Sequence, residues 1–542
     1  HTCGIQIKIV LSKPQFILVY ISLILSIFMA ALDQTIVSTA LKAIVVDLRH
    51  QQLIPWIGSA YLMTAAPVGT LYGKFADIFG RKWVFVFAIV VFELGSLLCG
   101  VATSMEFLIV GRAVAGIGGG GIFALVNIII TDIVSMRDRA KYQAAVGAFF
   151  GLAAVIAPLV GGSFADHVSW RWCFYINLPL GAITLVNIIL FLNFPPEFGS
   201  MKKKFGRVDI IGATLLFAAI ICLITPLQLG GSIWAWNSAQ VIATFVASVV
   251  LFVVFAYVEL KVAKEPIVPP AIFINSSVPA FLVINVAMGA AFLAGVYYIS
   301  LFFQVVFNDS ATDAGLHIIP FVCGIVLLSL FTGFFVSKFG HYKIFFLVGP
   351  FIVAAGTILI SMFDGSSTKA EQILYLAIFG IGLGNMIQLR VIGLQASVPL
   401  ELIAIATAVG QTCNSLGSAI GVAISGTIFN NVVTSNTAND VELQYFISKF
   451  QAMNITIQSS DVLSLLGLLQ ASASNYPSDP VAAAQYNATL ATATFELVIG
   501  FNDAFKIAYL TLLPYPGIVL LMALFFVKQF SINKSIAHSA AE

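Results

Sequence analysis

The sequence has few charged side chains. Of its 542 residues, 9% are Asp, Glu, Lys or Arg, whereas 60% are hydrophobic. A soluble domain carries about 25% charged residues, so this chain cannot form an ordinary water-facing surface. The net charge of +2 provides no basic excess of the kind that binds nucleic acid, and no nucleic-acid partner is expected. The composition therefore predicts an integral membrane protein whose main partner is the lipid bilayer.

Cysteine is also scarce. The chain has six cysteines and none of them forms a C-x-x-C pair, so neither a disulfide framework nor a zinc site is predicted. No apolar run contains a histidine cluster or a nucleophile beside a base. We therefore expect neither an enzyme nor a metal or organic cofactor.

Long apolar runs, by contrast, recur along the whole chain. A helix needs about 20 mostly apolar residues to cross a bilayer, and fourteen runs satisfy this length. The predicted fold is therefore all-α, a polytopic membrane protein with fourteen transmembrane helices. The predicted spans are 16–41, 55–76, 83–103, 107–133, 142–164, 173–194, 209–229, 239–261, 278–305, 314–337, 343–363, 371–395, 403–430 and 507–528.

Lysine and arginine are distributed unevenly between the two sides. If both termini are cytoplasmic, 18 of these residues fall on the cytoplasmic side and 6 on the outer side. Arg112 and Arg390 lie inside spans and are assigned to neither side. The positive-inside rule therefore favours cytoplasmic termini.

Two loops share one pattern. GKFADIFGRK runs from Gly73 to Lys82, and GFFVSKFGHYK runs from Gly333 to Lys343. In both, two glycines are seven residues apart, Phe precedes the second glycine, and cations follow. The repeat predicts two six-helix halves with two helices inserted between them, an arrangement typical of transporters. The predicted boundaries are 1–15 for the cytoplasmic N-terminus, 16–194 for the N-terminal half, 195–208 for a cytoplasmic linker, 209–261 for the inserted helices, 278–528 for the C-terminal half with an extracellular loop at 431–506, and 529–542 for a cytoplasmic tail.

The first of these loops has residues suited to a gating contact. Gly73 permits close helix approach, and Gly80 permits a tight turn. Asp77 can pair with Arg81 or cap a neighbouring helix, and Arg81 and Lys82 anchor the cytoplasmic side. The segment resembles the signature loop of the major facilitator superfamily.

Further segments, over roughly residues 20–430, resemble the fourteen-spanner drug:proton antiporter family in a version common among fungi. The resemblance implies a major-facilitator fold and proton-driven export of drugs or toxins. The matching segments are ALDQTIVSTAL (Ala31–Leu41), LIVGRAVAGIGGGG (Leu108–Gly121), GLAAVIAPLVGG (Gly151–Gly162), WRWCFYINLPLG (Trp170–Gly181), YYISLFFQVV (Tyr297–Val306) and GSAIGVAISGTIFNN (Gly417–Asn431).

The antiporter motif of the fifth span is matched with one departure. Pro158, Gly161 and Gly162 agree with the family pattern, but Ala157 stands where the family usually has Gly. In the fourth-span motif, Ala115 similarly replaces the usual Gln. The change at Ala157 weakens the case for antiport over uniport.

Three ionisable residues inside spans are candidates for proton coupling. A charge there costs about 2.5–3.5 kcal/mol, so it usually faces a cavity or a partner. Asp33 and Arg112 lie at similar depths, given about 1.5 Å of rise per residue. We hypothesise that they approach each other or share one cavity and that Asp33 carries the proton; the alternative is a structural ion pair with no role in coupling. Glu93 is either a second protonatable group or a neutral acid hydrogen-bonded to a neighbouring helix.

Polar and aromatic side chains within spans either line a cavity or bond between helices. Arg390 lies close to the cytoplasmic end of its span, so we expect it to snorkel to the interface, with contact to an anionic substrate as the alternative. The candidate residues for a substrate cavity are Asn127, Tyr298, Gln304, Asn385, Gln388, Gln411 and Asn414.

Three sequons fall on the predicted outer face, at Asn308, Asn454 and Asn487, and would accept glycans in a eukaryotic host. The function predicted from the sequence is proton-coupled export of small amphipathic compounds by a monomer in the plasma membrane, driven by the proton gradient. The alternatives are uptake of a siderophore or nutrient, vacuolar import of basic amino acids, and a membrane sensor without transport.

Overall fold

The computed structural model describes residues 12–48, 54–135, 138–193, 208–230, 234–263, 265–307, 309–438 and 480–529. Within these ranges the chain is almost entirely helical, and the sole β-type pairing is an isolated bridge between Gly230 and Trp234. In a bilayer every backbone polar group needs an internal partner, which a helix provides from its own chain. The predicted all-α class is confirmed.

The first half of the chain forms one helical bundle. Pairs α1–α5, α2–α4 and α3–α4 pack directly against each other. Buried apolar residues of these helices form its core. The helices are α1 (Lys13–Leu48), α2 (Ile54–Phe79), α3 (Arg81–Gly100), α4 (Met105–Ile133), α5 (Arg139–His167), α6 (Trp172–Tyr175) and α7 (Asn177–Phe191).

The second half forms a similar bundle with its own extensive core. Here α11 packs against α17, and α13 against α15. The helices are α11 (Ser277–Val306), α12 (Ala311–His317), α13 (Ile319–Phe339), α14 (Lys343–Ser361), α15 (Lys369–Gly384), α16 (Leu389–Ala396), α17 (Ile403–Ala438), α20 (Pro480–Leu510) and α21 (Pro514–Phe525), with short 3-10 turns at Pro270–Ile274 and Leu400–Leu402.

Two further helices, α9 (Ile210–Leu229) and α10 (Ala239–Lys261), form a hairpin beside the bundles. The Ser248 hydroxyl donates to the carbonyl of Ala219 at 2.9 Å and joins the two helices. α9 packs against α2 and α17, one helix from each half. The hairpin therefore covers one flank of the contact between the bundles.

Thirteen segments of the described chain are long and apolar enough to cross a membrane. They coincide with thirteen of the fourteen predicted spans. The other predicted span, 55–76, is α2, a helix of 26 residues that is not among the thirteen. The count of fourteen crossings therefore remains a prediction.

The predicted loop 431–506 differs from the structure at both ends. α17 continues to Ala438, and α20 already begins at Pro480. The last apolar segment starts at Leu497, ten residues before the predicted span. Asn502, Asp503 and Lys506 interrupt the apolar run there, although the backbone stays helical. The predicted linker 195–208 lies almost wholly outside the described residues, as does most of both termini.

Both repeated loops turn at a glycine with positive φ, although ψ is 141° at Gly80 and 1° at Gly340. Gly80 has φ 92° and Gly340 has φ 76°, the two positive values among the described glycines. Each sits between consecutive helices, where glycine adopts this conformation without steric cost. The sequence repeat therefore recurs in the structure as a positive-φ glycine between consecutive helices, with a different ψ at each.

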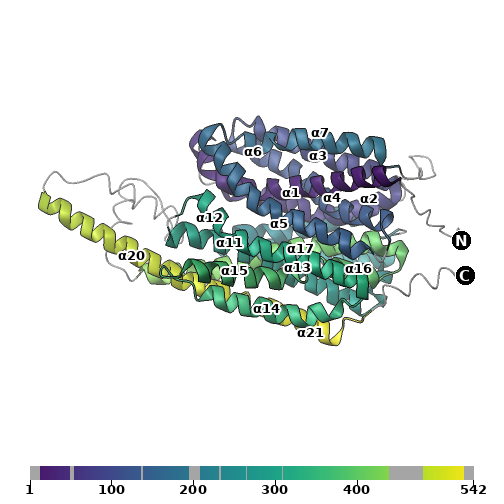
Figure 1. Ribbon diagram of the computed structural model, residues 1–542. Helices are drawn as coiled ribbons and strands as arrows, with labels where there is room; N and C mark the ends of the chain where they lie inside the picture. The colour runs from purple at the N-terminus through teal and green to yellow at the C-terminus, as the bar shows by residue number, and fades with distance from the viewer. Residues whose placement is uncertain are drawn as a thin grey trace, which may run out of the picture.

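The bundles lie side by side along their length (Figure 1). α5 packs against α13, and α2 packs against α17. Side chains also join the two halves: Thr70 and Thr412 hydroxyls lie 2.6 Å apart, and Gln143 Nε2 donates to Gln395 Oε1 at 3.2 Å. The start of α1 and the end of α21 lie toward the same end of the molecule (Figure 1).

Candidate functional site: a buried ion pair and a central cavity

Asp33 and Arg112 form a direct ion pair. Arg112 Nη1 donates to Asp33 Oδ2 at 2.6 Å, between α4 and α1. Asp33 is 0% exposed and Arg112 is 1% exposed. At such burial the pair is protected from solvent screening, so removing either charge would leave the other uncompensated.

Neutral groups complete the surroundings of this pair. Asn177 Nδ2 donates to Asp33 Oδ1 at 3.2 Å and lies 3.2 Å from Ser96 Oγ. Arg112 Nε donates to the carbonyl of Ile57 at 3.2 Å. The guanidinium also lies over the ring of Tyr61, 4.7 Å from its centroid. Five helices (α1, α2, α3, α4 and α7) thus contribute to one buried polar cluster.

Glu93 lies beside this cluster on α3. Neither carboxyl oxygen has a hydrogen-bond partner among the described residues, so of the two alternatives for Glu93 the bond to a neighbouring helix is not present. The carboxyl group faces Gly181 on α7, where an added Cβ would lie 1.8 Å from Oε1. The absence of a side chain at Gly181 therefore makes the space that Glu93 occupies.

The loop between α2 and α3 is built on a charge network. Arg81 Nη2 lies 2.7 Å from Asp77 Oδ1, and Arg81 Nε lies 3.0 Å from Asp132 Oδ2 at the end of α4. Lys82 Nζ donates to the carbonyl of Ile189 at 2.7 Å. The expected Asp77–Arg81 pair is present, and Asp132 is a partner that the sequence analysis missed.

Gly73, at the start of the same motif, lies at the contact between the halves. A Cβ added there would meet the Cβ of Ala408 on α17 at 2.7 Å. Its counterpart Gly333 lies against α5 in the same way, with a distance of 2.5 Å to the Cβ of Ala144. The repeated glycines thus permit close approach on the two symmetric contacts, α2–α17 and α13–α5.

The antiporter-motif residues lie on α5. Gly161 and Gly162 are buried, and the Cys173 thiol of α6 lies 3.9 Å from the carbonyl oxygen of Gly161. Pro158 lies within the helix, but its side chain is outside the described residues. The contact at Gly161 places α6 close to α5.

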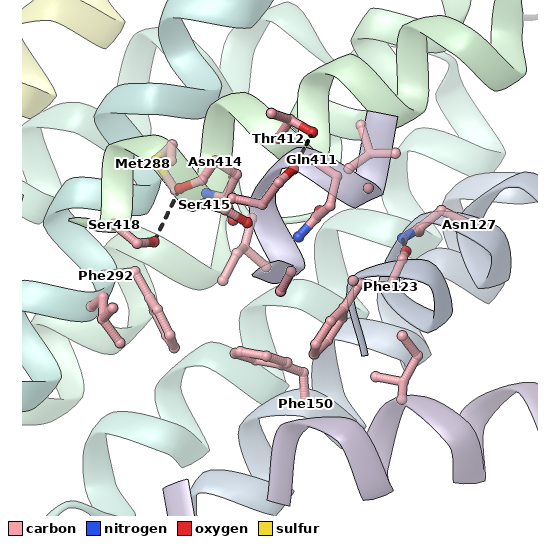
Figure 2. Close-up of a pocket in the computed structure, with 18 of the residues that line it drawn as sticks. Phe123, Asn127, Phe150, Met288, Phe292, Gln411, Thr412, Asn414, Ser415 and Ser418 are labelled. Atoms are coloured by element: carbon pink, nitrogen blue, oxygen red, sulfur yellow. Dashed lines mark hydrogen bonds between the residues drawn. The ribbon is translucent and has the colours of Figure 1, made fainter. Parts of the chain in front are cut away.

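A cavity lies between the two halves, lined by α1, α2, α4, α5, α11, α17 and the segment around α16. The space open to the centres of water-sized molecules is about 120 Å³. Figure 2 shows aromatic rings on one side and most of the amides and hydroxyls on the other, with Asn127 beside Phe123. The labelled aromatic residues are Phe123, Phe150 and Phe292, and the labelled polar residues include Gln411, Thr412, Asn414, Ser415 and Ser418.

The cavity is adjacent to the ion pair. Gln34, which follows Asp33 on α1, lines the cavity, as does Leu62, which follows Tyr61 on α2. The same helices therefore contact both the cavity and the buried charges, so a change at one can be transmitted to the other through helix position.

Four of the predicted cavity residues line this cavity: Asn127, Gln388, Gln411 and Asn414. The other three do not. Tyr298 packs against Phe429 with ring centroids 5.5 Å apart, and Gln304 donates to the carbonyl of Ser300 on its own helix at 3.3 Å. Asn385 is buried beside Gly349 of α14. Their spacing in the sequence did not show which face of each helix points inward.

The expected snorkelling of Arg390 is wrong. This side chain is 7% exposed and lines the central cavity. Its Nε donates to the carbonyl of Ile387 at 2.9 Å, and its Nη1 donates to Asn285 Oδ1. The side chain therefore points into the protein and not toward the membrane interface.

The predicted glycosylation sites are largely outside the described structure. Asn308 and Asn454 lie outside the described residues, and Asn487 lies on the described backbone of α20 without a described side chain.

Asn177, which donates to Asp33, was not predicted as a site residue. Its presence in the otherwise apolar YINLPLG segment was the available signal.

The comparisons with known proteins agree with this architecture. The family described as Major Facilitator Superfamily matches residues 23–422. The MFS-type efflux pump MFS1 of Arthroderma benhamiae is 37% identical over 443 residues, which cover 81% of each chain. The efflux pump aflT of Aspergillus parasiticus is 35% identical over 434 residues, covering 79% of this chain and 84% of the pump. Among solved structures, the proton:xylose symporter XylE with bound 6-bromo-6-deoxy-D-glucose has a TM-score of 0.56 at 13% identity, covering 96% of this chain and 97% of its own.

The chain belongs to the major facilitator superfamily. It is an integral, multi-pass membrane protein and a transporter, with relatives named as fungal efflux pumps. Because the symporter is only 13% identical in sequence, its structural similarity shows a shared fold and nothing about function.

Proposed function

We propose that this protein exports small amphipathic compounds, such as drugs or toxins, in exchange for protons. The observation that carries the proposal is the cavity between the two halves, which combines an aromatic wall with a polar wall. Such a surface suits compounds that are largely apolar but carry a few polar groups. The efflux-pump names of relatives at 35–37% identity support the outward direction.

Binding would proceed through contacts on both sides of the cavity. Phe150 lies between Phe123 and Phe292, with ring centroids 5.9 and 5.6 Å away, so the three rings form a continuous apolar surface across the two halves. Opposite them, Asn414 and Ser418 are held by hydrogen bonds to carbonyls of α11. A compound seated here would contact both halves and respond to their relative movement.

Proton coupling would use the ion pair beside the cavity. Protonation of Asp33 would remove its charge and leave Arg112 without a counter-ion in a buried site. That change in free energy would favour a different arrangement of α1, α4 and the helices bonded to them. Glu93, next to the same cluster, is proposed as a second group that can accept a proton.

The setting of the protein is part of the same proposal. We expect a monomer in the plasma membrane, with both termini cytoplasmic and glycans on the outer sequons; a vacuolar membrane is the alternative. The proton gradient would be the energy source, with no bound cofactor.

Transport in proteoliposomes tests this function. With an imposed pH gradient, labelled amphipathic compounds should move against protons in the wild type. Asp33→Asn should abolish the pH-driven component while exchange at equal pH persists, because the cavity itself is unchanged. Survival of pH-driven transport in Asp33→Asn would exclude Asp33 as the coupling carboxylate, and accumulation in the opposite direction would favour uptake.

A further inference from the structure

Arg390 is a cation at the wall of the central cavity. It lies at the start of α16 (Leu389–Ala396), directly after the segment that joins α15 to α16. Its guanidinium is held by two neutral acceptors, the carbonyl of Ile387 and the side-chain oxygen of Asn285. Both bonds orient the charged group without neutralising it.

The described residues that line the cavity provide no opposite charge. Arg390 is the one ionisable residue among them, and no ion pair joins it to a described carboxylate. Asp33, on α1, is already paired with Arg112. A guanidinium in a poorly solvated cavity without a counter-ion is energetically unfavourable, so an anion arriving there is strongly attracted.

Asn285 fixes the direction of this charge. Its Nδ2 donates to the carbonyl of Phe281 at 2.7 Å, so its oxygen must face Arg390. The backbone carbonyl of Asn285 also accepts from Asn414 Nδ2 at 3.2 Å. The guanidinium is therefore connected to the polar wall of the cavity by an ordered chain of hydrogen bonds.

We propose that Arg390 binds the acidic group, a carboxylate or ionised phenol, of an aromatic compound that the protein exports. This inference rests on the proposed function and specifies its substrate class. The guanidinium would pair with the acid through charge-assisted hydrogen bonds, while Phe123, Phe150 and Phe292 contact the aromatic body. A cationic compound of the same shape would be repelled.

Three fluorescent probes of one shape test the proposal: anthracene-9-carboxylate, anthracene-9-carboxamide and anthracen-9-ylmethylammonium. Their affinities are measured on the full-length protein in phosphatidylcholine nanodiscs at neutral pH, after subtraction of empty nanodiscs. The wild type should bind the carboxylate about tenfold more tightly than the carboxamide, and the ammonium most weakly, because a charge-assisted hydrogen bond contributes about that factor. Equal affinity for carboxylate and carboxamide in the wild type would overturn the proposal without any variant.

Variants at this position separate charge from fold. Arg390→Gln should lose about tenfold in affinity for the carboxylate and leave the carboxamide within about twofold. Arg390→Lys should keep part of the preference. Arg171→Gln, which removes an arginine that pairs with Asp47 and does not line the cavity, is the matched control and should change neither affinity. A carboxylate preference that persists in a folded Arg390→Gln protein would contradict the role of Arg390.

Transport of the carboxamide separates a failure of the proposed Arg390 role from a failure of the proposed export function. If pH-driven export of the carboxamide occurs but no preference for the carboxylate is found, the export function stands and the role of Arg390 fails. If the binding preference is present but no probe is moved by a pH gradient, the proposed export fails instead.

Discussion

At the scale of single residues, the Asp33–Arg112 pair predicts strong coupling between two substitutions. Removing one partner of a buried ion pair costs about 3–5 kcal/mol, because the other charge stays buried. Asp33→Asn and Arg112→Gln should each lower the thermal stability of the purified protein markedly. The double variant should be less destabilised than the sum of the two, since it leaves no unpaired charge. Thermal unfolding in detergent, followed for all four proteins, provides the double-mutant cycle.

Additive effects in that cycle would show that the two side chains do not interact in solution. Tyr61→Phe is a suitable control, because it keeps the ring under the Arg112 guanidinium and removes a neutral hydroxyl, not a charge. Its stability should stay close to that of the wild type.

Some of these residues could be identified from the sequence and others could not. Asp33 and Arg112 stand out because a charge in an apolar run needs a partner. Asn177 does not, since a neutral amide in a membrane helix has many acceptable partners. Arg390 was assigned to the interface because its distance from the end of a span is readable, whereas the direction of its helix face is not.

At the scale of helices, the contact between α2 and α17 depends on the absence of a side chain at Gly73. Gly73→Ala would place a Cβ 2.7 Å from the Cβ of Ala408 and should slow transport several-fold. Ala408→Gly in the same protein should restore much of the rate. Gly58→Ala on the same helix is the control, because nothing lies within 4 Å of a Cβ there. Initial rates of transport in proteoliposomes measure the effect.

If Gly73→Ala transports at the wild-type rate, the close approach of α2 and α17 is not required in the transport cycle. If Ala408→Gly fails to improve it, the obstruction lies elsewhere, for example at the carbonyl of Ala404, which would be 3.2 Å from the new Cβ.

The end of α1 is joined to the start of α6 by a contact that depends on pH. Asp47 accepts hydrogen bonds from Arg171 Nη1 at 2.7 Å and from Trp170 Nε1 at 3.0 Å. These bonds, that of Arg171 foremost, lower the pKa of Asp47. Because the pKa is lower in the folded protein, the contact stabilises the fold above the unfolded pKa of about 3.9 and is lost as the pH falls through the folded value.

Asp47→Asn should therefore lower the unfolding temperature slightly at pH 7, and the difference from the wild type should shrink as the pH falls below about 3.9 and vanish below the lowered pKa of Asp47 in the folded protein. The effect is small because Asp47 is exposed. Unfolding temperatures of both proteins across this pH range measure it. A difference that stays constant with pH would mean that ionised Asp47 does not stabilise the fold through its bonds to Arg171 and Trp170.

Helix boundaries were predicted least well where polar residues interrupt an apolar run. The predicted last span begins ten residues too late, because Asn502, Asp503 and Lys506 lower the hydropathy there, yet the backbone continues as α20. The predicted sixth span is divided at Ile176 into α6 and α7, and hydropathy cannot detect such a short interruption. Hydropathy records how apolar a segment is, not where its backbone hydrogen bonds end.

At the scale of the whole molecule, alternating access requires the two halves to separate at the Thr70–Thr412 contact. The hydroxyls are 2.6 Å apart, so cysteines at both positions should form a disulfide under mild oxidation. In a background without native cysteines, oxidation should reduce transport at least about tenfold, and a reductant should restore it. The two single-cysteine proteins are the controls, and transport rates before and after reduction provide the measurement. Full activity of the cross-linked protein would show that this contact stays closed throughout the cycle.

The two-bundle arrangement was foreseeable from one short repeat, since Gly73 and Gly80 have counterparts at Gly333 and Gly340. The place of the inserted hairpin was not. α9 and α10 are almost uniformly apolar, and such sequences carry no pattern that shows which neighbours they contact. Their position beside α2 and α17 follows from long-range packing, which a local pattern does not encode.

The position of α2 also has a consequence for how the protein is made. This helix contacts α4, α17 and α9, so its residues face protein more than lipid and do not need to be strongly apolar. Thr64, Thr70 and Lys74 can therefore be accommodated, but a nascent chain emerging from the ribosome does not yet have those neighbours. We expect α2 to enter the bilayer during synthesis together with α1 or α4, so that its insertion depends on a partner helix.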